Sequence, residues 1–157
     1  MVTSEPSQFF AGWPTPARGW PDWVSAEPYS GDGIPSGNPL ATTDSGANCQ
    51  RYAYSVLALF GVAVPPHRSS ELWDDASFTH PAVALVRRLD LVLFNGNSAA
   101  WGAHVAVYMG GDEFLHLCKE IGHPAVWSWA DFAARPRYAN TVGIVRAGEA
   151  TSSRLVN

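Results

Sequence analysis

One amphipathic helix followed by a series of strand-like segments constrains the fold more than any other feature of this sequence. Apolar side chains recur at helical spacing from Cys49 to Phe60, and Gly61 ends the pattern. Segments with the β-branched and aromatic content of strands follow at residues 90–94, 103–108, 113–117 and 141–145. One leading helix with mostly antiparallel strands predicts an α+β fold, in which the helix packs on a sheet or a small barrel.

Shorter elements complete the expected secondary structure. Ser69 or Ser70 is suited to cap a short helix over residues 71–74, and Ser128 to cap one over residues 129–132. Residues 82–88 fit a helix or a strand equally well. The long helix has three candidate N-caps, Asp44, Ser45 and Asn48.

By composition the chain divides into three parts. Residues 1–43 contain twelve Pro or Gly residues and six aromatic side chains, Phe9, Phe10, Trp13, Trp20, Trp23 and Tyr29. Because each buried aromatic contributes roughly 2–3 kcal/mol, we expect this N-terminal arm to be irregular but held against the body by its aromatics. Its tryptophans also make the arm a candidate surface for a partner protein. Residues 44–147 form the expected folded domain, and residues 148–157 a flexible tail.

Charge and hydropathy narrow the range of partners and locations. The net charge is −4 and the sequence holds no Lys/Arg cluster, so we expect neither nucleic acid nor a membrane surface as a partner. Residues 52–64, the longest near-apolar run, fall short of the ~20 residues that span a bilayer. The first residues lack the basic and apolar regions of a secretory signal, which predicts a cytoplasmic location unless a dedicated route exports the protein.

Cys49 is the first candidate for chemistry. It lies at the N-terminal end of the expected long helix, where free N–H groups and the helix dipole stabilise an anion. This position lowers the pKa of catalytic cysteines and supplies donors for an oxyanion. A free cysteine is also often buried as a small hydrophobic residue, so position alone leaves its role open.

His104 and His116 lie on the two arms of an expected hairpin. A three-residue loop at 110–112 places Ala106 opposite His116, and both histidines then share one face of the sheet. A two-residue loop places them on opposite faces. The shared-face register suits a triad in which one imidazole takes the thiol proton of Cys49 and the second orients the first.

The order helix-Cys, strand-His, hairpin, strand-His resembles the NlpC family of papain-like cysteine peptidases. The resemblance is carried by residues 90–94, 104–110 and 114–116 within a matching region of 44–145. It implies a papain-like fold and a Cys–His–His triad that cleaves amide bonds, typically in bacterial cell-wall peptides, with no cofactor and no metal ion. Carried over by residue, Cys49 is the nucleophile, His104 the general base and His116 the orienting third member.

The surroundings of Cys49 depart from that family. The usual Asp-Cys-Ser-Gly is Asn48-Cys49-Gln50-Arg51 here, and the tyrosine that often precedes the nucleophile has its nearest counterpart in the arm. The residues that we expect to contact a peptide or amide substrate are Asn48, Gln50, Arg51, Tyr29 and Trp101. Cys118 is expected in the core or at the edge of the site, without a catalytic role.

Other functions compete with hydrolysis. The same scaffold can pass the acyl group to an amine or alcohol, which makes an acyltransferase. A non-catalytic domain is the other class: Cys49, His104 and His116 would then ligate a metal such as zinc, or the fold would serve only to bind a partner.

Overall fold

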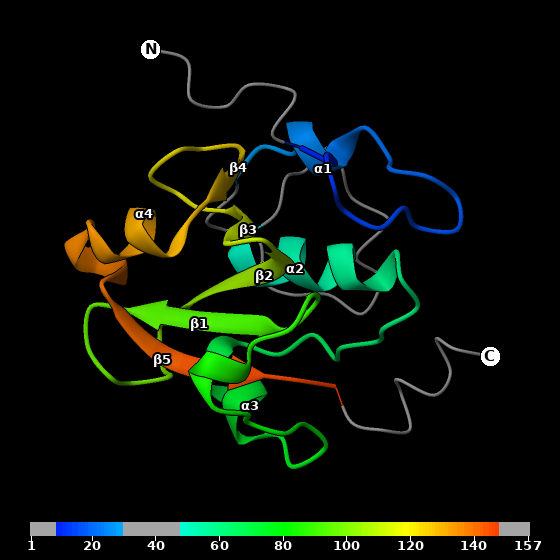
Figure 1. Ribbon diagram of the computed structural model, residues 1–157. Helices are drawn as coiled ribbons and strands as arrows, with labels where there is room; N and C mark the ends of the chain where they lie inside the picture. Colours follow the sequence, from blue (N-terminus) through cyan, green and yellow to red (C-terminus); the bar gives the residue numbers. More distant parts are fainter. Residues whose placement is uncertain (1–8, 30–47, 148–157) are drawn as a thin grey trace.

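The computed structural model describes residues 9–29 and 48–147, and within them an open antiparallel sheet forms the centre of the molecule (Figure 1). Its strands are β1 (Leu91–Asn95), β2 (His104–Gly110), β3 (Glu113–Leu117), β4 (Pro124–Trp127) and β5 (Asn140–Val145). They lie in the order β4-β3-β2-β1-β5, and every neighbouring pair is antiparallel. The expected α+β fold is confirmed, and of the two expected forms the sheet is the one present.

The helices are α1 (Trp23–Ala26), α2 (Cys49–Ala58), α3 (Ser69–Asp74) and α4 (Trp129–Ala133), with 3-10 turns η3 (Val83–Leu85) and η4 (Pro136–Tyr138). Asn48 caps α2: its side chain accepts a hydrogen bond from the Arg51 N–H at 2.9 Å. The alternative caps Asp44 and Ser45 lie outside the described residues. No helix within 9–29 and 48–147 has the length and apolar character needed to cross a membrane.

Strand β4 was not expected from the sequence. It has four residues, begins with Pro124 and lies at the edge of the sheet. Proline is tolerated there because the first residue of an edge strand needs no ladder hydrogen bond from its nitrogen. The segment 82–88, which fitted a helix or a strand, contains the 3-10 turn η3.

The sheet separates two hydrophobic layers, one toward α2 and one toward α4. Alternate side chains of β2 enter different layers, as the period of two in a strand requires. Val105 and Val107 belong to the layer that includes α2, whereas Ala106 belongs to the layer of α4. His104 points into this second layer, where its ring contacts Phe132 of α4.

The described part of the arm packs against α2 and the turn after it (Figure 1, blue). The ring centroids of Trp20 and Phe60 are 5.5 Å apart, and those of Trp23 and Tyr52 are 5.9 Å apart. Aromatic contacts therefore anchor this described stretch. The remaining arm residues, 1–8 and 30–43, and the expected tail at 148–157 lie outside the described residues.

The β2–β3 hairpin has a two-residue turn and, next to it, a bulge. The turn residues Gly111 and Asp112 both have positive φ, 58° and 62°, as a tight hairpin turn requires. Gly110 pairs with Glu113, but a register shift between Tyr108 and Gly110 adds one residue on β2.

That added residue decides the orientation of the histidines. Val107 pairs with Leu115, so one step further along the strands Ala106 lies opposite His116. This is the register of a three-residue loop, and it places His104 and His116 on the same face of the sheet. A two-residue turn without the bulge would have separated them.

Candidate active site

The two histidines are joined by a hydrogen bond. Nε2 of His104 and Nδ1 of His116 are 2.9 Å apart, and the rings meet nearly edge to face. This contact occupies one nitrogen of His104 and leaves Nδ1 for another partner. If Nδ1 is to accept a proton, the hydrogen of neutral His104 must be on Nε2, which then donates to Nδ1 of His116.

Both imidazoles are neutral near pH 7 because the protein buries them. Burial lowers the pKa of His104 to about 3. The pKa of His116 is held well below its ordinary value, first by burial and then by electrostatic interaction with His104 and Arg135. A neutral imidazole with an available lone pair is the form that a general base requires.

Cys49 is the first residue of α2, and its side chain is partly exposed. Burial of the sulfur raises the pKa of the Cys49 thiol to about 11, although the backbone N–H groups of Val105 and Gln50 oppose this shift. The N–H groups at the helix start lower this pKa, as expected from the position, but desolvation outweighs them, so the thiol pKa is raised and not lowered. The resting site holds a neutral thiol and a neutral imidazole.

A cavity of about 320 Å³ connects Cys49 with His104. Three of the expected substrate contacts, Asn48, Gln50 and Tyr29, line the same cavity. His116 does not line it, because it lies behind His104 at the far end of the hydrogen bond.

The other expected contacts lie elsewhere. Arg51 is buried at 7% exposure and does not line the cavity. Trp101 is 78% exposed and also lies outside the lining, although its neighbour Gly102 belongs to it. Cys118 is buried in the layer between the sheet and α4, as expected for a core residue.

Tyr29 reaches the site from the arm. Its N–H donates to the carbonyl oxygen of Gly122 at 3.0 Å, which fixes this part of the arm beside the loop between β3 and β4. The pKa of Tyr29 is raised, first by burial and then by the proximity of Cys49 and Cys118. A tyrosine far upstream in the sequence thus lies in the same cavity as the nucleophile candidate.

Sequence reasoning missed the charges around the cavity. Arg68, Lys119 and Arg137 line it, whereas no carboxylate of the described residues does. The three cations come from the residue before α3, the loop after β3 and the turn η4. No sequence pattern groups them, because only the fold brings these segments together. Their arrangement favours an anionic ligand.

Aromatic side chains close the site behind the second histidine. The ring centroid of Trp127 lies 4.2 Å from that of His116, and the Arg135 guanidinium lies 4.0 Å above the Trp127 ring. On the cavity side, Tyr138 packs on His104 with ring centroids 5.0 Å apart. These contacts fix both imidazole planes and were not evident in the sequence.

The donor geometry does not support a metal site. Within 9–29 and 48–147, no three His, Cys, Asp or Glu side chains are grouped so that they could hold a metal ion. His104 and His116 direct a nitrogen at each other, not at a common point with Cys49. The alternative of a metal-binding domain on these three residues therefore loses its structural basis.

Several solved structures share this fold. The peptidoglycan hydrolase RipB from Mycobacterium tuberculosis is 22% identical with a TM-score of 0.54, over 79% of this chain and 62% of its own. A lipoprotein-like NLP/P60 family protein from Staphylococcus aureus is 19% identical with a TM-score of 0.55, over 79% and 37%. An NlpC/P60 family protein from Bacillus cereus is 16% identical with a TM-score of 0.51, over 65% and 32%.

These likenesses establish the fold. The protein has the papain-like fold of the NlpC/P60 proteins, which confirms the expected resemblance at this level. The matched region spans less than two thirds of the length of each of these three proteins. No family model and no curated protein matches the sequence.

Proposed function

We propose that the protein is a cysteine hydrolase that cleaves an amide bond in a cell-wall peptide. The observation that carries this proposal is the hydrogen-bonded pair His104–His116, whose free side shares a cavity with Cys49 at the start of a helix. The likeness in fold to RipB, a peptidoglycan hydrolase, supports the choice of substrate class.

The first half of the proposed reaction forms a thioester. Sγ of Cys49 attacks the carbonyl carbon of the amide while the thiol proton passes to Nδ1 of His104. This coupled transfer suits a thiol that is protonated at rest and an imidazole that is neutral. The negative charge that develops on the carbonyl oxygen is stabilised by N–H groups at the start of α2 and by the hydroxyl of Tyr29.

The second half releases the products. His104 gives its proton to the amine nitrogen as the carbon–nitrogen bond breaks, and the amine leaves. His104 then takes a proton from water, whose oxygen attacks the thioester carbon. The acid is released, and the proton returns to the Cys49 sulfur.

His116 acts through His104. It accepts the Nε2 hydrogen and holds the imidazole plane toward the cavity. Burial and the positive charge of Arg135 disfavour protonation of His116, so the proton taken from Cys49 stays on His104. His116 is thus a positioning residue in this proposal.

The positive charges that line the cavity narrow the class of substrate further. Arg68, Lys119 and Arg137 favour a peptide that carries carboxylates close to the bond that is cut. In this proposal Trp101, which is exposed beside the lining residue Gly102, contacts a part of the substrate outside the cavity. A cell-wall substrate also requires that the protein reach the wall, so the proposal includes export by a dedicated route.

Product analysis tests the proposal and separates hydrolysis from acyl transfer. The protein is incubated with purified peptidoglycan peptides in water enriched in ¹⁸O, with and without an added primary amine, and the products are measured by mass spectrometry. Hydrolysis gives a free amine and a carboxylate that contains ¹⁸O. An acyl–amine conjugate as the main product would assign an acyltransferase, and unchanged peptides would contradict both.

A further inference from the structure

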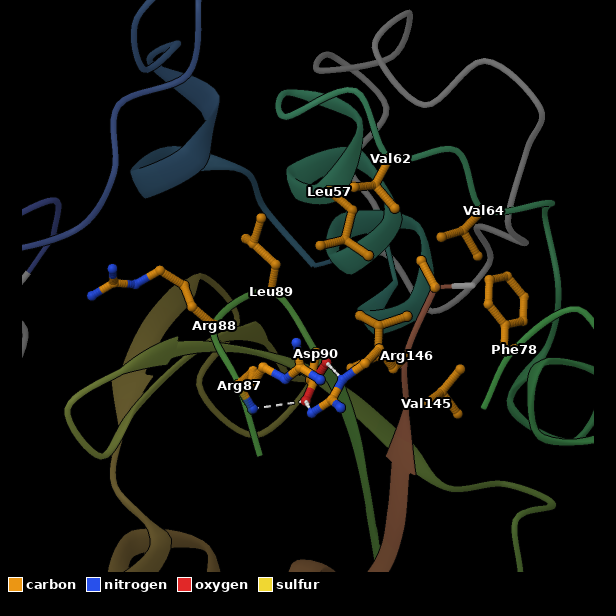
Figure 2. Close-up of a pocket in the computed structure, with 12 residues that line it drawn as sticks. Leu57, Val62, Val64, Phe78, Arg87, Arg88, Leu89, Asp90, Val145 and Arg146 are labelled. Carbon is orange, nitrogen blue, oxygen red and sulfur yellow. Dashed lines mark hydrogen bonds and ion pairs between the residues drawn. The ribbon is translucent and has the colours of Figure 1, made fainter. Parts of the chain in front are cut away.

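A second cavity lies at the opposite end of α2 from Cys49 (Figure 2). Leu57 lies eight residues after Cys49, which corresponds to about 12 Å along the helix. The volume of this cavity is about 140 Å³. Its apolar wall includes Leu57, Val62, Val64, Phe78, Leu89 and Val145. A cavity of about 150 Å³ with such a lining accommodates a benzene ring.

The single carboxylate in this wall, among the described residues, is already neutralised. Asp90 is buried, and its Oδ1 accepts a hydrogen bond from Nε of Arg146 at 2.8 Å. Its Oδ2 accepts from Nη2 of Arg146 at 2.7 Å and from the backbone N–H of Arg87 at 2.8 Å (Figure 2). Asp90 therefore has little capacity left to repel an anion or to bind a cation.

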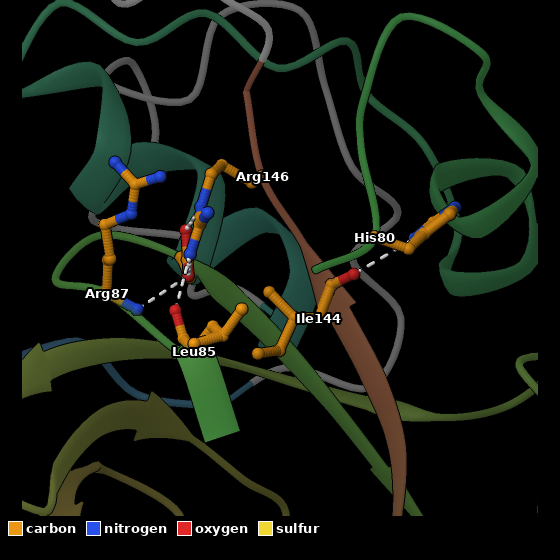
Figure 3. Close-up of polar contacts among 6 residues, drawn as sticks. His80, Leu85, Arg87, Ile144 and Arg146 are labelled. Atoms are coloured by element: carbon orange, nitrogen blue, oxygen red, sulfur yellow. Dashed lines mark hydrogen bonds and ion pairs between the residues drawn. The ribbon is translucent and has the colours of Figure 1, made fainter. Parts of the chain in front are cut away.

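Donors remain at the edge of the cavity. Nη2 of Arg146 also donates to the Leu85 carbonyl oxygen at 2.9 Å, but its Nη1 has no partner in the described part of the chain. The Arg87 guanidinium likewise makes no hydrogen bond or ion pair there, and Arg87 and Arg146 extend side by side (Figure 3). Arg88 lines the wall with its stem only, because its guanidinium turns away to the Met109 carbonyl oxygen (Figure 2).

We propose that this cavity is a binding site for a small amphipathic carboxylate. The apolar wall takes a ring-sized group, and the carboxylate binds the free donors of Arg87 and Arg146. A carboxylate fits because its two oxygens match the paired N–H groups of a guanidinium. The charge balance agrees: Arg146 offsets Asp90, the Arg88 guanidinium turns away, and the positive charge of Arg87 remains at the cavity.

The test is a titration of the full-length protein with three probes, and binding is monitored through the ¹³C-methyl NMR signals of leucine and valine. The probes are 3-phenylpropionate, the neutral 3-phenylpropan-1-ol and propionate. We expect 3-phenylpropionate to shift the methyl signals of Leu57, Val62 and Val64 saturably, the alcohol to bind about tenfold more weakly, and propionate to leave these signals unchanged. Unshifted methyl signals, or equal binding of acid and alcohol, would overturn the proposal.

Two variants test the two halves of the site. Arg87→Gln should weaken binding of 3-phenylpropionate by about tenfold and leave the alcohol unaffected, whereas Arg18→Gln, at an exposed arginine of the arm, should change neither. Val64→Phe places a ring in the half-buried rim and should abolish binding of both probes. Equal affinity of the Arg87 and Arg18 variants for the acid would overturn the assignment of the carboxylate position.

Discussion

His104 and His116 are hydrogen-bonded across two strands, with 2.9 Å between Nε2 and Nδ1, because a bulge beside the hairpin turn places both on one face. The bulge therefore builds the base and its orienting partner. Cys49 lines the same cavity as His104, so a local feature of the hairpin determines whether the proposed triad can form.

The positioning role of His116 predicts a graded response to substitution. His116→Ala removes the acceptor for Nε2 of His104, so we expect kcat to fall by about a hundredfold, less than for His104→Ala. His116→Asn offers a carbonyl oxygen as acceptor and should restore part of that loss. Steady-state kinetics of the three variants measure this, and equal activity of His116→Ala and His104→Ala would count against separate roles.

The acid and alkaline limits of activity should be unusually far apart. His104 must be neutral and the Cys49 thiol protonated, and their pKa values are about 3 and about 11. We therefore expect kcat/KM to vary little between about pH 5 and pH 9. If kcat/KM instead decreases as the pH is lowered through about 6.5, the ordinary histidine pKa, then His104 titrates normally.

Acid should weaken the fold through the same histidines. Both have a folded-state pKa below the unfolded value of about 6.5, so their full contribution to stability is present above this pH and is lost as pH falls. Between pH 7 and pH 5 we expect the free energy of unfolding to drop by about 2–4 kcal/mol, as measured with urea. His116→Gln should reduce the drop by about half.

The matched control for acid stability is His123→Gln, at an exposed loop position. This variant should retain the full drop in unfolding free energy. An identical pH dependence in the His116 and His123 variants would show that the buried pair is not its source.

The hydroxyl of Tyr29 is expected to support the oxyanion. Tyr29→Phe keeps the ring in the cavity wall and removes one donor, so kcat should fall by about tenfold to a hundredfold with little change in KM. Tyr108→Phe, at a tyrosine outside the cavity, is the control and should leave kcat unchanged. If Tyr29→Phe keeps the full kcat, the hydroxyl does not stabilise the oxyanion and Tyr29 serves only as part of the cavity wall.

Much of this architecture could be predicted from local patterns. The helix that begins near Cys49, four of the strands and the α+β class follow from spacing and residue type, since these features depend on neighbours in sequence. The hairpin was predicted only as two alternatives. Turn residues did not reveal the bulge between Tyr108 and Gly110, which is set by pairing between strands.

What could not be predicted depends on long-range packing. The pKa of Cys49 rises because of burial by distant segments, which a helix position does not show. Arg51 is adjacent to the nucleophile in sequence but points into the protein, while Lys119 and Arg137 reach the cavity from far along the chain. The expected surface for a partner protein on the arm stays a prediction.

The most direct test of the account compares two cysteine variants in the digestion of peptidoglycan peptides. Cys49→Ala should lose all cleavage, whereas Cys118→Ala, at the buried second cysteine, should retain it; circular dichroism confirms that both are folded. We predict that wild type and Cys118→Ala cleave the peptides and that Cys49→Ala does not. A folded Cys49→Ala protein that still cleaves would contradict the central claim that Cys49 is the nucleophile.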